Sequence, residues 1–186
     1  MNRSRKCGFL AVFFLAFLDL PVVASDLDLT QRFLLLAATK TSTMQKELEE
    51  ASAAGYRVFG ASPTSGSEIV VILEKIATPP STYQYLLQAT TRTSTMQKEL
   101  NDAAARGFRL LPQSIVAKQP VFGATEIVLL MEKPPVSPGE FKYLLLATSR
   151  TSTMQREMSE AIDQGYRVIG MVSRGEHIVI LEQEPK

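Results

Sequence analysis

Two spacings of apolar residues alternate along the chain. Met44, Leu48 and Ala51 lie at positions i, i+4 and i+7, and the residues between them are mostly polar. This spacing predicts a short amphipathic helix. Continuous apolar runs of strand length precede and follow such helices, at Phe33–Ala38, Ile69–Leu73, Tyr85–Ala89, Ile127–Met131, Tyr143–Ala147 and Ile178–Leu181. The pattern therefore predicts a mixed α+β fold.

A copied segment marks each predicted helix. The pentapeptide Thr-Ser-Thr-Met-Gln occurs at Thr41–Gln45, Thr93–Gln97 and Thr151–Gln155, and a Gly-aromatic-Arg triplet follows each copy. Successive copies lie 52 and 58 residues apart, which exceeds the usual periods of solenoid repeats. We therefore expect three tandem β-α-β-β repeats, over residues 32–76, 83–133 and 141–183, in preference to a stacked superhelix.

Residues at both ends of the predicted helices carry known signals. Gly55, Gly107 and Gly165 stand where a left-handed residue would end each helix. A serine followed three residues later by glutamine fits a capping box at each start. These pairs are Ser42 and Gln45, Ser94 and Gln97, and Ser152 and Gln155.

Each repeat is expected to fold as strand, helix, strand, strand. A helical crossover makes the first two strands parallel, and we place the third strand antiparallel between them. The hairpin that joins the last two strands should be tight at Ser173–Gly175 and wider at Ser62–Ser67. The second repeat has the longest hairpin loop, around Pro112–Thr125.

The closing strands are apolar at consecutive positions, as in Ile69–Leu73. Strands of this kind are normally covered on both faces. The helix of each repeat covers one face, so another element must cover the second. We expect the second faces of the three sheets to pack together, with a possible pseudo-threefold axis, and oligomerisation is the alternative source of cover.

Several short motifs resemble a family of small bacterial domains of unknown function. In the second repeat, Tyr83-Gln84-Tyr85 opens a strand, Leu100-Asn101 lies in the helix, and Gly107-Phe108-Arg109 precedes an apolar hairpin. The family combines an aromatic strand, a helix with Leu-Asn and a Gly-Trp hairpin. This chain has Tyr or Phe in place of that Trp, and Leu-Asn in the second repeat only. The resemblance spans roughly residues 33–183 and implies a β-α-β-β unit without a defined activity.

The first 25 residues have the three parts of a secretory signal peptide. Three bases precede the apolar stretch Gly8–Leu18, and Val23–Ser25 is a small-residue cleavage site. The apolar stretch is shorter than the roughly 20 residues that a membrane-spanning helix needs. We therefore expect cleavage near Ser25 and a periplasmic or secreted protein without a stable membrane anchor.

Removal of this leader changes the chemistry of the chain. Cys7, the single cysteine, leaves with the leader, so we expect neither a disulfide nor thiol chemistry in the mature protein. The leader also holds three of the 20 bases and one of the 19 acids, which leaves a formal net charge of −1. This balance lacks the basic footprint of a nucleic-acid binder.

Few residues offer catalytic chemistry. His177 is the only histidine and belongs to one repeat, so we interpret it as a surface or packing residue. One histidine without cysteine makes no recognisable zinc cluster, and we expect neither metal nor cofactor. Glu47, Glu99 and Glu157 recur, but each lies on a solvated helix face beside a base. We expect no enzyme; a hydrolase that uses carboxylates is the remaining enzymatic alternative.

A base precedes every threonine-rich motif and supports a second hypothesis. Bases at a helix start oppose the helix dipole, and a bound anion would reconcile the two. The candidate anion-binding residues are Lys40, Thr41, Ser42, Thr43, Arg92, Thr93, Ser94, Thr95, Arg150, Thr151, Ser152 and Thr153. Helix capping is the simpler interpretation, because hydroxyl oxygens accept hydrogen bonds from the unpaired N–H groups there.

The arginine of each Gly-aromatic-Arg triplet is expected to pair with a strand acid. The arginines are Arg57, Arg109 and Arg167, and the acids include Glu74, Glu132 and Glu182. The aromatic residues Tyr56, Phe108 and Tyr166 are expected in the core. The sequence thus favours an exported, non-enzymatic structural or ligand-binding repeat protein of the bacterial cell envelope. Its partner would be an envelope protein or a small anionic ligand.

Overall fold

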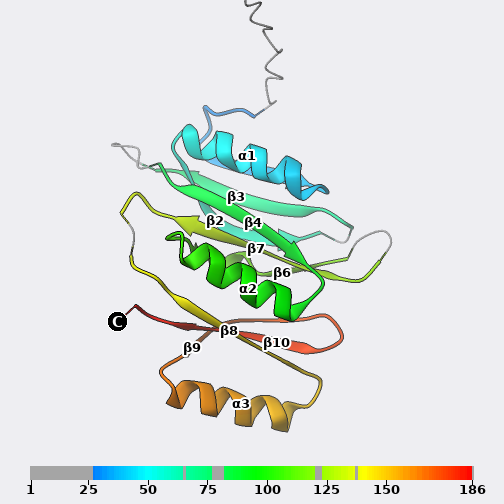
Figure 1. The fold of residues 1–186 in the computed structure, drawn as a ribbon. Helices are drawn as coiled ribbons and strands as arrows, with labels where there is room; N and C mark the ends of the chain where they lie inside the picture. Colours follow the sequence, from blue (N-terminus) through cyan, green and yellow to red (C-terminus); the bar gives the residue numbers. More distant parts are fainter. Residues whose placement is uncertain (1–26, 65, 77–81, 120–122, 137, 186) are drawn as a thin grey trace, which may run out of the picture.

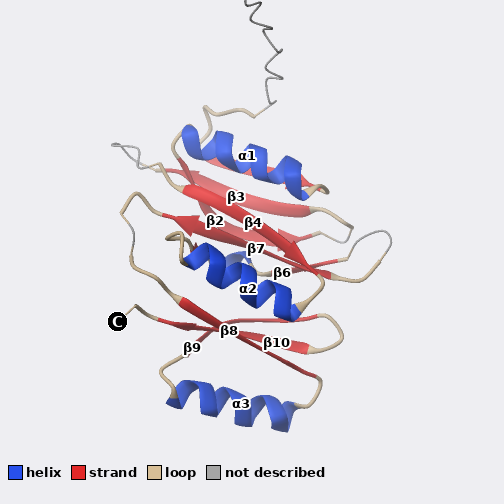
Figure 2. Ribbon diagram, viewed as in Figure 1, coloured by secondary structure: helices blue, strands red, loops and turns tan. Residues whose placement is uncertain are grey.

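The computed structural model describes residues 27–64, 66–76, 82–119, 123–136 and 138–185. Within these ranges, ten strands and three α-helices form a mixed α+β fold with antiparallel sheets (Figure 2). The expected signal peptide, and residues 77–81 between the first two expected repeats, lie outside the described residues.

Three groups of elements follow one another along the chain, and we refer to them as units 1, 2 and 3. Unit 1 consists of β1 (Phe33–Ala38), α1 (Thr41–Ala53), β2 (Tyr56–Pro63) and β3 (Ile69–Lys75). Unit 2 consists of β4 (Gln84–Thr90), α2 (Thr93–Ala104), β5 (Arg109–Leu110), the 3₁₀-helix η1 (Pro112–Ser114), β6 (Val116–Lys118) and β7 (Glu126–Lys133). Unit 3 consists of β8 (Lys142–Thr148), α3 (Thr151–Asp163), β9 (Arg167–Ser173) and β10 (His177–Gln183).

Each unit forms its own sheet, and the strand order follows the expectation from the sequence. The orders are β1-β3-β2, β4-β7-β5 and β8-β10-β9, with β6 also paired to β7. The last strand of each unit is therefore central and antiparallel to both neighbours. The first strand of each sheet is left at an edge.

The helix ends are confirmed as expected, whereas the helix starts are not. Gly55, Gly107 and Gly165 have φ angles of 88°, 87° and 88°, which an L side chain rarely adopts. The predicted capping boxes are wrong, because Lys40, Arg92 and Arg150 are the N-cap residues and make no side-chain cap hydrogen bond. The serines Ser42, Ser94 and Ser152 therefore lie within the first turn, one residue past the helix start.

The long hairpin of unit 2 contains more regular structure than the sequence indicated. Pro112–Ser114 form a 3₁₀-helix, and Val116–Lys118 pair with β7 as a further strand. The predicted loop at Pro112–Thr125 is therefore partly wrong, although residues 120–122 of this loop lie outside the described residues. The tight turn after Ser173 is confirmed, since Gly175 has a φ of 89°.

The three units are stacked in chain order (Figure 1). Helix α1 lies near one end of the molecule and α3 at the other, with α2 between the sheets of units 2 and 3. Tyr85 and Leu130 of unit 2 belong to the core of unit 1, while Tyr143 and Ile180 of unit 3 belong to the core of unit 2. The expected meeting of three second faces about a pseudo-threefold axis is therefore wrong. Each sheet instead packs against the unit before it.

This order decides which central strands are covered on both faces. Every residue of Ile127–Glu132 in β7 and of Ile178–Glu182 in β10 is buried. In β3, by contrast, Ile69, Val71 and Leu73 are buried while Ile72 between them is 39% exposed. The expected two-sided cover is confirmed for units 2 and 3 only, because no described element precedes unit 1 in the stack.

Candidate functional site: the joints between units

A three-residue polar cluster links unit 1 to unit 2. Arg57, at the start of β2, donates from Nε and Nη2 to the two carboxylate oxygens of Glu132 on β7, at 3.0 and 2.8 Å. The hydroxyl of Tyr85 on β4 donates to Glu132 at 2.9 Å and accepts the backbone N–H of Val58 at 3.0 Å. Both hydrogen bonds of the tyrosine are buried, so the cluster is part of the interior.

A second cluster of the same three residue types links unit 2 to unit 3. Arg109 donates from Nε and Nη2 to Glu182 at 3.0 and 2.8 Å. The hydroxyl of Tyr143 donates to Glu182 at 3.1 Å and accepts the N–H of Leu110 at 2.8 Å. We refer to these two clusters as joint 1–2 and joint 2–3. Their matching geometry comes from residues that stand at matching places in the three units.

Strand pairing explains why tyrosine and glutamate meet. Tyr85 lies directly opposite Glu132 in the β4–β7 pair, and Tyr143 lies opposite Glu182 in the β8–β10 pair. Directly opposed residues share one face of a sheet and lie within side-chain reach of each other. The arginine approaches from the edge strand of the preceding unit, whose unpaired backbone N–H the tyrosine hydroxyl accepts.

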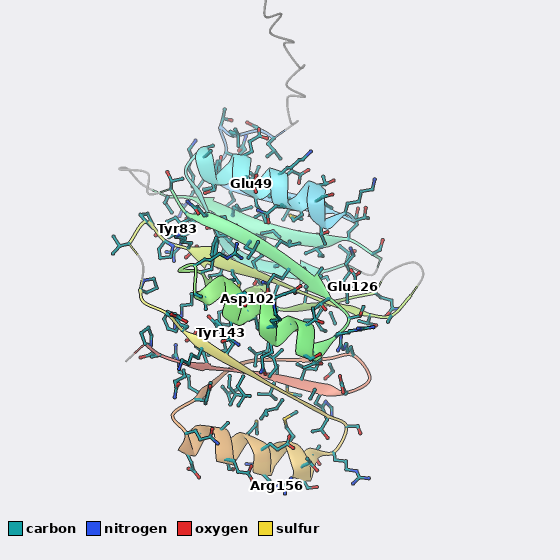
Figure 3. The ribbon with its side chains drawn as sticks, viewed as in Figure 1. Glu49, Tyr83, Asp102, Glu126, Tyr143 and Arg156 are labelled. Atoms are coloured by element: carbon teal, nitrogen blue, oxygen red, sulfur yellow. The ribbon has the colours of Figure 1, made fainter. Side chains whose placement is uncertain are left out.

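An aromatic ring covers the arginine in each joint. The guanidinium carbon of Arg57 lies 4.5 Å from the ring centre of Tyr83, and that of Arg109 lies 4.2 Å from the ring centre of Phe141. Figure 3 labels Tyr83 and Tyr143 at these joints. A cation over an aromatic face is attracted by the ring quadrupole, so each ring helps to fix the position of its arginine.

Unit 3 has an arginine but no described unit beyond it. Arg167 therefore turns to its own sheet and donates to Glu182 at 2.7 Å, so that this carboxylate receives two guanidinium groups. At the other end, Glu74 has no arginine from a preceding unit and accepts hydrogen bonds from the neighbouring Arg32. The expected pairing of triplet arginines with strand acids is confirmed for Glu132 and Glu182, but not for Glu74.

Electrostatics favour a charged carboxylate at Glu182 in joint 2–3 and a neutral phenol in both joints. Burial by itself would raise the pKa of Glu182, but hydrogen bonds from Arg109 and Arg167 outweigh it and hold that pKa below its usual range. Burial, with the nearby glutamate, raises the pKa of Tyr85 and of Tyr143 well above the ordinary tyrosine value. Each phenol thus keeps the proton that it donates to the carboxylate.

A cleft of about 560 Å³ runs beside both joints. Arg57, Arg109 and Arg167 line it with side chains that are 46%, 38% and 51% exposed. The two carboxylates of the cleft are 6% and 1% exposed. Three cations thus face two anions, and an anion in solution would meet guanidinium groups before carboxylates.

A second contact between units involves the glutamine of the copied pentapeptide. Gln45 donates from Nε2 to the carbonyl of Tyr85 and accepts the N–H of Leu87, both at 2.9 Å. Gln97 accepts the N–H of Leu145 at 2.9 Å in the same way. These glutamines satisfy the open edge of the next unit's first strand, which explains why they do not reach back to cap their own helices.

The residues proposed for anion binding do not gather at one place. Each set lies at the start of its own helix, and Lys40, Arg92 and Arg150 are exposed. In unit 2 the hydroxyl of Thr93 accepts a hydrogen bond from Arg174 at 3.0 Å and lies 3.5 Å from a carboxylate oxygen of Glu176. Arg174 and Glu176 also lie 3.6 Å apart as an ion pair, so both a cation and an anion stand beside this helix start. Anion binding at the helix starts remains a prediction.

Other candidate chemistry stays isolated in the structure. His177 is half-buried, and its Nδ1 lies 3.2 Å from the Ser173 hydroxyl. Among the described residues, no three metal-ligating side chains lie close enough to hold an ion. No helix in the same part of the chain has the length and apolar character needed to cross a membrane.

Sequence reasoning missed two parts of the joints. Tyr85 and Tyr143 stand in apolar runs, which predict strands but no polar contact between units. The available signal is that Phe33, at the matching place of unit 1, lacks the hydroxyl. Gln45 and Gln97 fit capping boxes in the sequence, whereas the structure pairs them with the next unit. Comparisons with protein-family models, curated proteins and solved structures found no match.

Proposed function

We propose that this chain is an exported, non-enzymatic repeat protein that serves as a structural module of the bacterial cell envelope. The observation that carries this proposal is the use of the recurring polar residues. The arginine of the triplet and the glutamine of the pentapeptide hold one unit to the next in both joints. Residues that recur for a structural reason need no substrate to explain them.

The state of the joint carboxylates argues against a hydrolase that uses carboxylates. A general acid at neutral pH needs a raised pKa, whereas the pKa of Glu182 is lowered. Glu132 accepts two hydrogen bonds from Arg57 and a third from Tyr85. Both side chains are buried under these partners and are engaged in holding the units together.

A ligand-binding role is the second candidate, and the cleft favours it. Its three half-exposed arginines would meet a small anion more readily than the separate helix starts would. The helix-start hypothesis and the cleft differ in the residues that an anion needs: Lys40, Arg92 and Arg150 for the former, and Arg167 for the latter.

Thermal unfolding in inorganic phosphate separates these roles. We compare the wild type with the triple variant Lys40→Ala, Arg92→Ala, Arg150→Ala and with Arg167→Ala, at ionic strength matched with chloride. The structural role predicts the same small change of Tm in all three proteins. A rise that the triple variant alone loses would support the helix starts, and a rise that Arg167→Ala alone loses would support the cleft; either replaces the structural proposal.

A further inference from the structure

Exposed large apolar side chains gather at the two ends of the stack. Among the described residues, eight such side chains are exposed, and seven of them belong to units 1 and 3. Those of unit 1 are Phe33, Leu35, Phe59 and Ile72, and those of unit 3 are Ile162, Val168 and Met171. Soluble proteins rarely leave clustered apolar side chains uncovered without a binding role.

Two of the exposed side chains of unit 1, Phe33 and Leu35, stand at places that the joints bury elsewhere. Phe33 is 50% exposed, whereas Tyr85 and Tyr143 at the matching places are 4% and 2% exposed. Leu35 is 63% exposed, whereas the matching Leu145 is 8% exposed. The outer face of unit 1 thus presents the same positions with which unit 2 contacts unit 1 in joint 1–2, and we call it the receiving face. In the described part of the chain, no side chain takes the place that Gln45 has in joint 1–2.

The exposed side chains of unit 3 complete the comparison. Val168 is 47% exposed, whereas Val58 and Leu110 at the matching places are 6% and 1% exposed. Ile162 is 51% exposed and corresponds to Ser52, whose hydroxyl donates to the carbonyl of Tyr83 across joint 1–2. Gln155, the pentapeptide glutamine of unit 3, is also exposed. The outer face of unit 3 therefore presents the same positions with which unit 1 contacts unit 2 in joint 1–2, and we call it the donating face.

We propose that unit 3 of one molecule docks on unit 1 of a second copy of this chain, head to tail, through a contact built like joints 1–2 and 2–3. This inference rests on the structural role proposed above and names its partner. Gln155 would bind the free edge of β1 at Leu35, as Gln45 binds β4 at Leu87. A contact between unlike faces leaves one face free at each end, so it continues into a chain or closes into a ring.

The contact between copies is weaker than the joints within a molecule. Phe33 has no hydroxyl for the N–H of Val168, and Gln31 stands where Tyr83 and Phe141 cover the arginines. Glu74, the acid that Arg167 would meet, already accepts from Arg32 at 2.9 Å. Association is therefore reversible and depends on protein concentration.

Sedimentation velocity of two variants and their mixture tests the proposal in the full chain. Leu35→Asp places a charge on the receiving face, and Met171→Asp places one on the donating face. Each variant alone should stay monomeric at concentrations where the wild type associates. Mixed one to one, they should form a dimer, because each keeps the half that the other has lost. Val136→Asp, at an 82% exposed apolar residue away from both faces, is the control and should associate like the wild type.

A variant that should strengthen the contact between copies provides an independent test. Phe33→Tyr restores the hydroxyl that joints 1–2 and 2–3 contain, and we expect it to lower the dissociation constant roughly fivefold, as one added buried hydrogen bond does. A monomeric wild type at all concentrations would overturn the proposal, and so would a mixture of the two aspartate variants that stays monomeric. The sedimentation experiments contain chloride and no phosphate. A negative result for association therefore leaves the structural role untouched, because that role is tested separately by thermal unfolding in phosphate.

Discussion

At the scale of single residues, one hydroxyl group does two tasks in each joint. The Tyr143 hydroxyl accepts the N–H of Leu110 and donates to Glu182, and both partners are buried. Leaving a buried donor or acceptor without its partner costs about 1–3 kcal/mol. The aromatic ring two residues earlier has a different part, because it packs against the core and covers a guanidinium group without needing a hydroxyl. Unit 2 has Tyr83 there and unit 3 has Phe141.

This difference gives a matched pair of tyrosine-to-phenylalanine variants. We expect Tyr143→Phe to lower the free energy of unfolding by about 2 kcal/mol, because the Leu110 amide and Glu182 each lose a buried partner. Tyr83→Phe reproduces the residue found in unit 3 and should change stability by less than about 0.5 kcal/mol. Urea unfolding followed by circular dichroism measures both. Equal effects of the two substitutions would contradict the role assigned to the Tyr143 hydroxyl.

At the scale of elements, helices α1 and α2 each form side-chain hydrogen bonds with the first strand of the following unit. The first strand of a unit lies at a sheet edge, and its outward N–H and C=O groups need partners where the helix of the preceding unit covers them. The side-chain amide of Gln45 supplies one donor and one acceptor to β4. Asn101 of α2 adds the same pair of bonds to the backbone of Tyr143. The helix thus substitutes for a missing neighbouring strand.

A glutamine-to-alanine pair tests this role of the helix. Gln45→Ala removes two hydrogen bonds to β4, and we expect a loss of about 1–2 kcal/mol in the free energy of unfolding. Hydrogen exchange at the Leu87 amide should become faster in the same variant. Gln155→Ala, at the exposed matching place in α3, should leave the stability of the monomer unchanged. No change in Leu87 exchange would show that Gln45 does not protect this edge.

At the scale of the whole molecule, the units share two interiors. One core combines residues of units 1 and 2, and a second combines residues of units 2 and 3. Stability of the stack therefore depends on the charge state of the joints between them. Because the pKa of Glu182 is lower in the folded protein than its usual 4.5, the folded state binds fewer protons than the unfolded state does in this range. Stability from this group is present above about pH 4.5 and is lost as the pH falls through the folded pKa.

We expect the melting temperature to fall as the pH is lowered below about 5, and the fall to be smaller in Glu182→Gln. At pH 7 this variant should be about 3 kcal/mol less stable than the wild type, because two guanidinium groups lose their charged partner. Glu74→Gln, in an exposed pair at the end of the stack, is the control and should keep the acid dependence of the wild type. Parallel acid profiles of wild type and Glu182→Gln would contradict the assignment.

Local order was largely predictable, whereas the arrangement of the units was not. The spacing of Met44, Leu48 and Ala51 fixed the buried face of a helix, and the glycines marked the helix ends, because both signals act within a few residues. The face that covers β7 comes from another unit, and no local spacing reports which one. Gln45 illustrates the limit: its sequence neighbours fit a cap, while its actual partners, Tyr85 and Leu87, lie some 40 residues later.

Unit 2 carries both halves of a joint, one toward unit 1 and one toward unit 3. A further copy of that unit, inserted in series, would meet on each side the same kind of side chains that it already meets. Recombination within the coding sequence could therefore lengthen or shorten the molecule without any new contact having to evolve. The length of a protein built on this plan is set by the number of units in its chain.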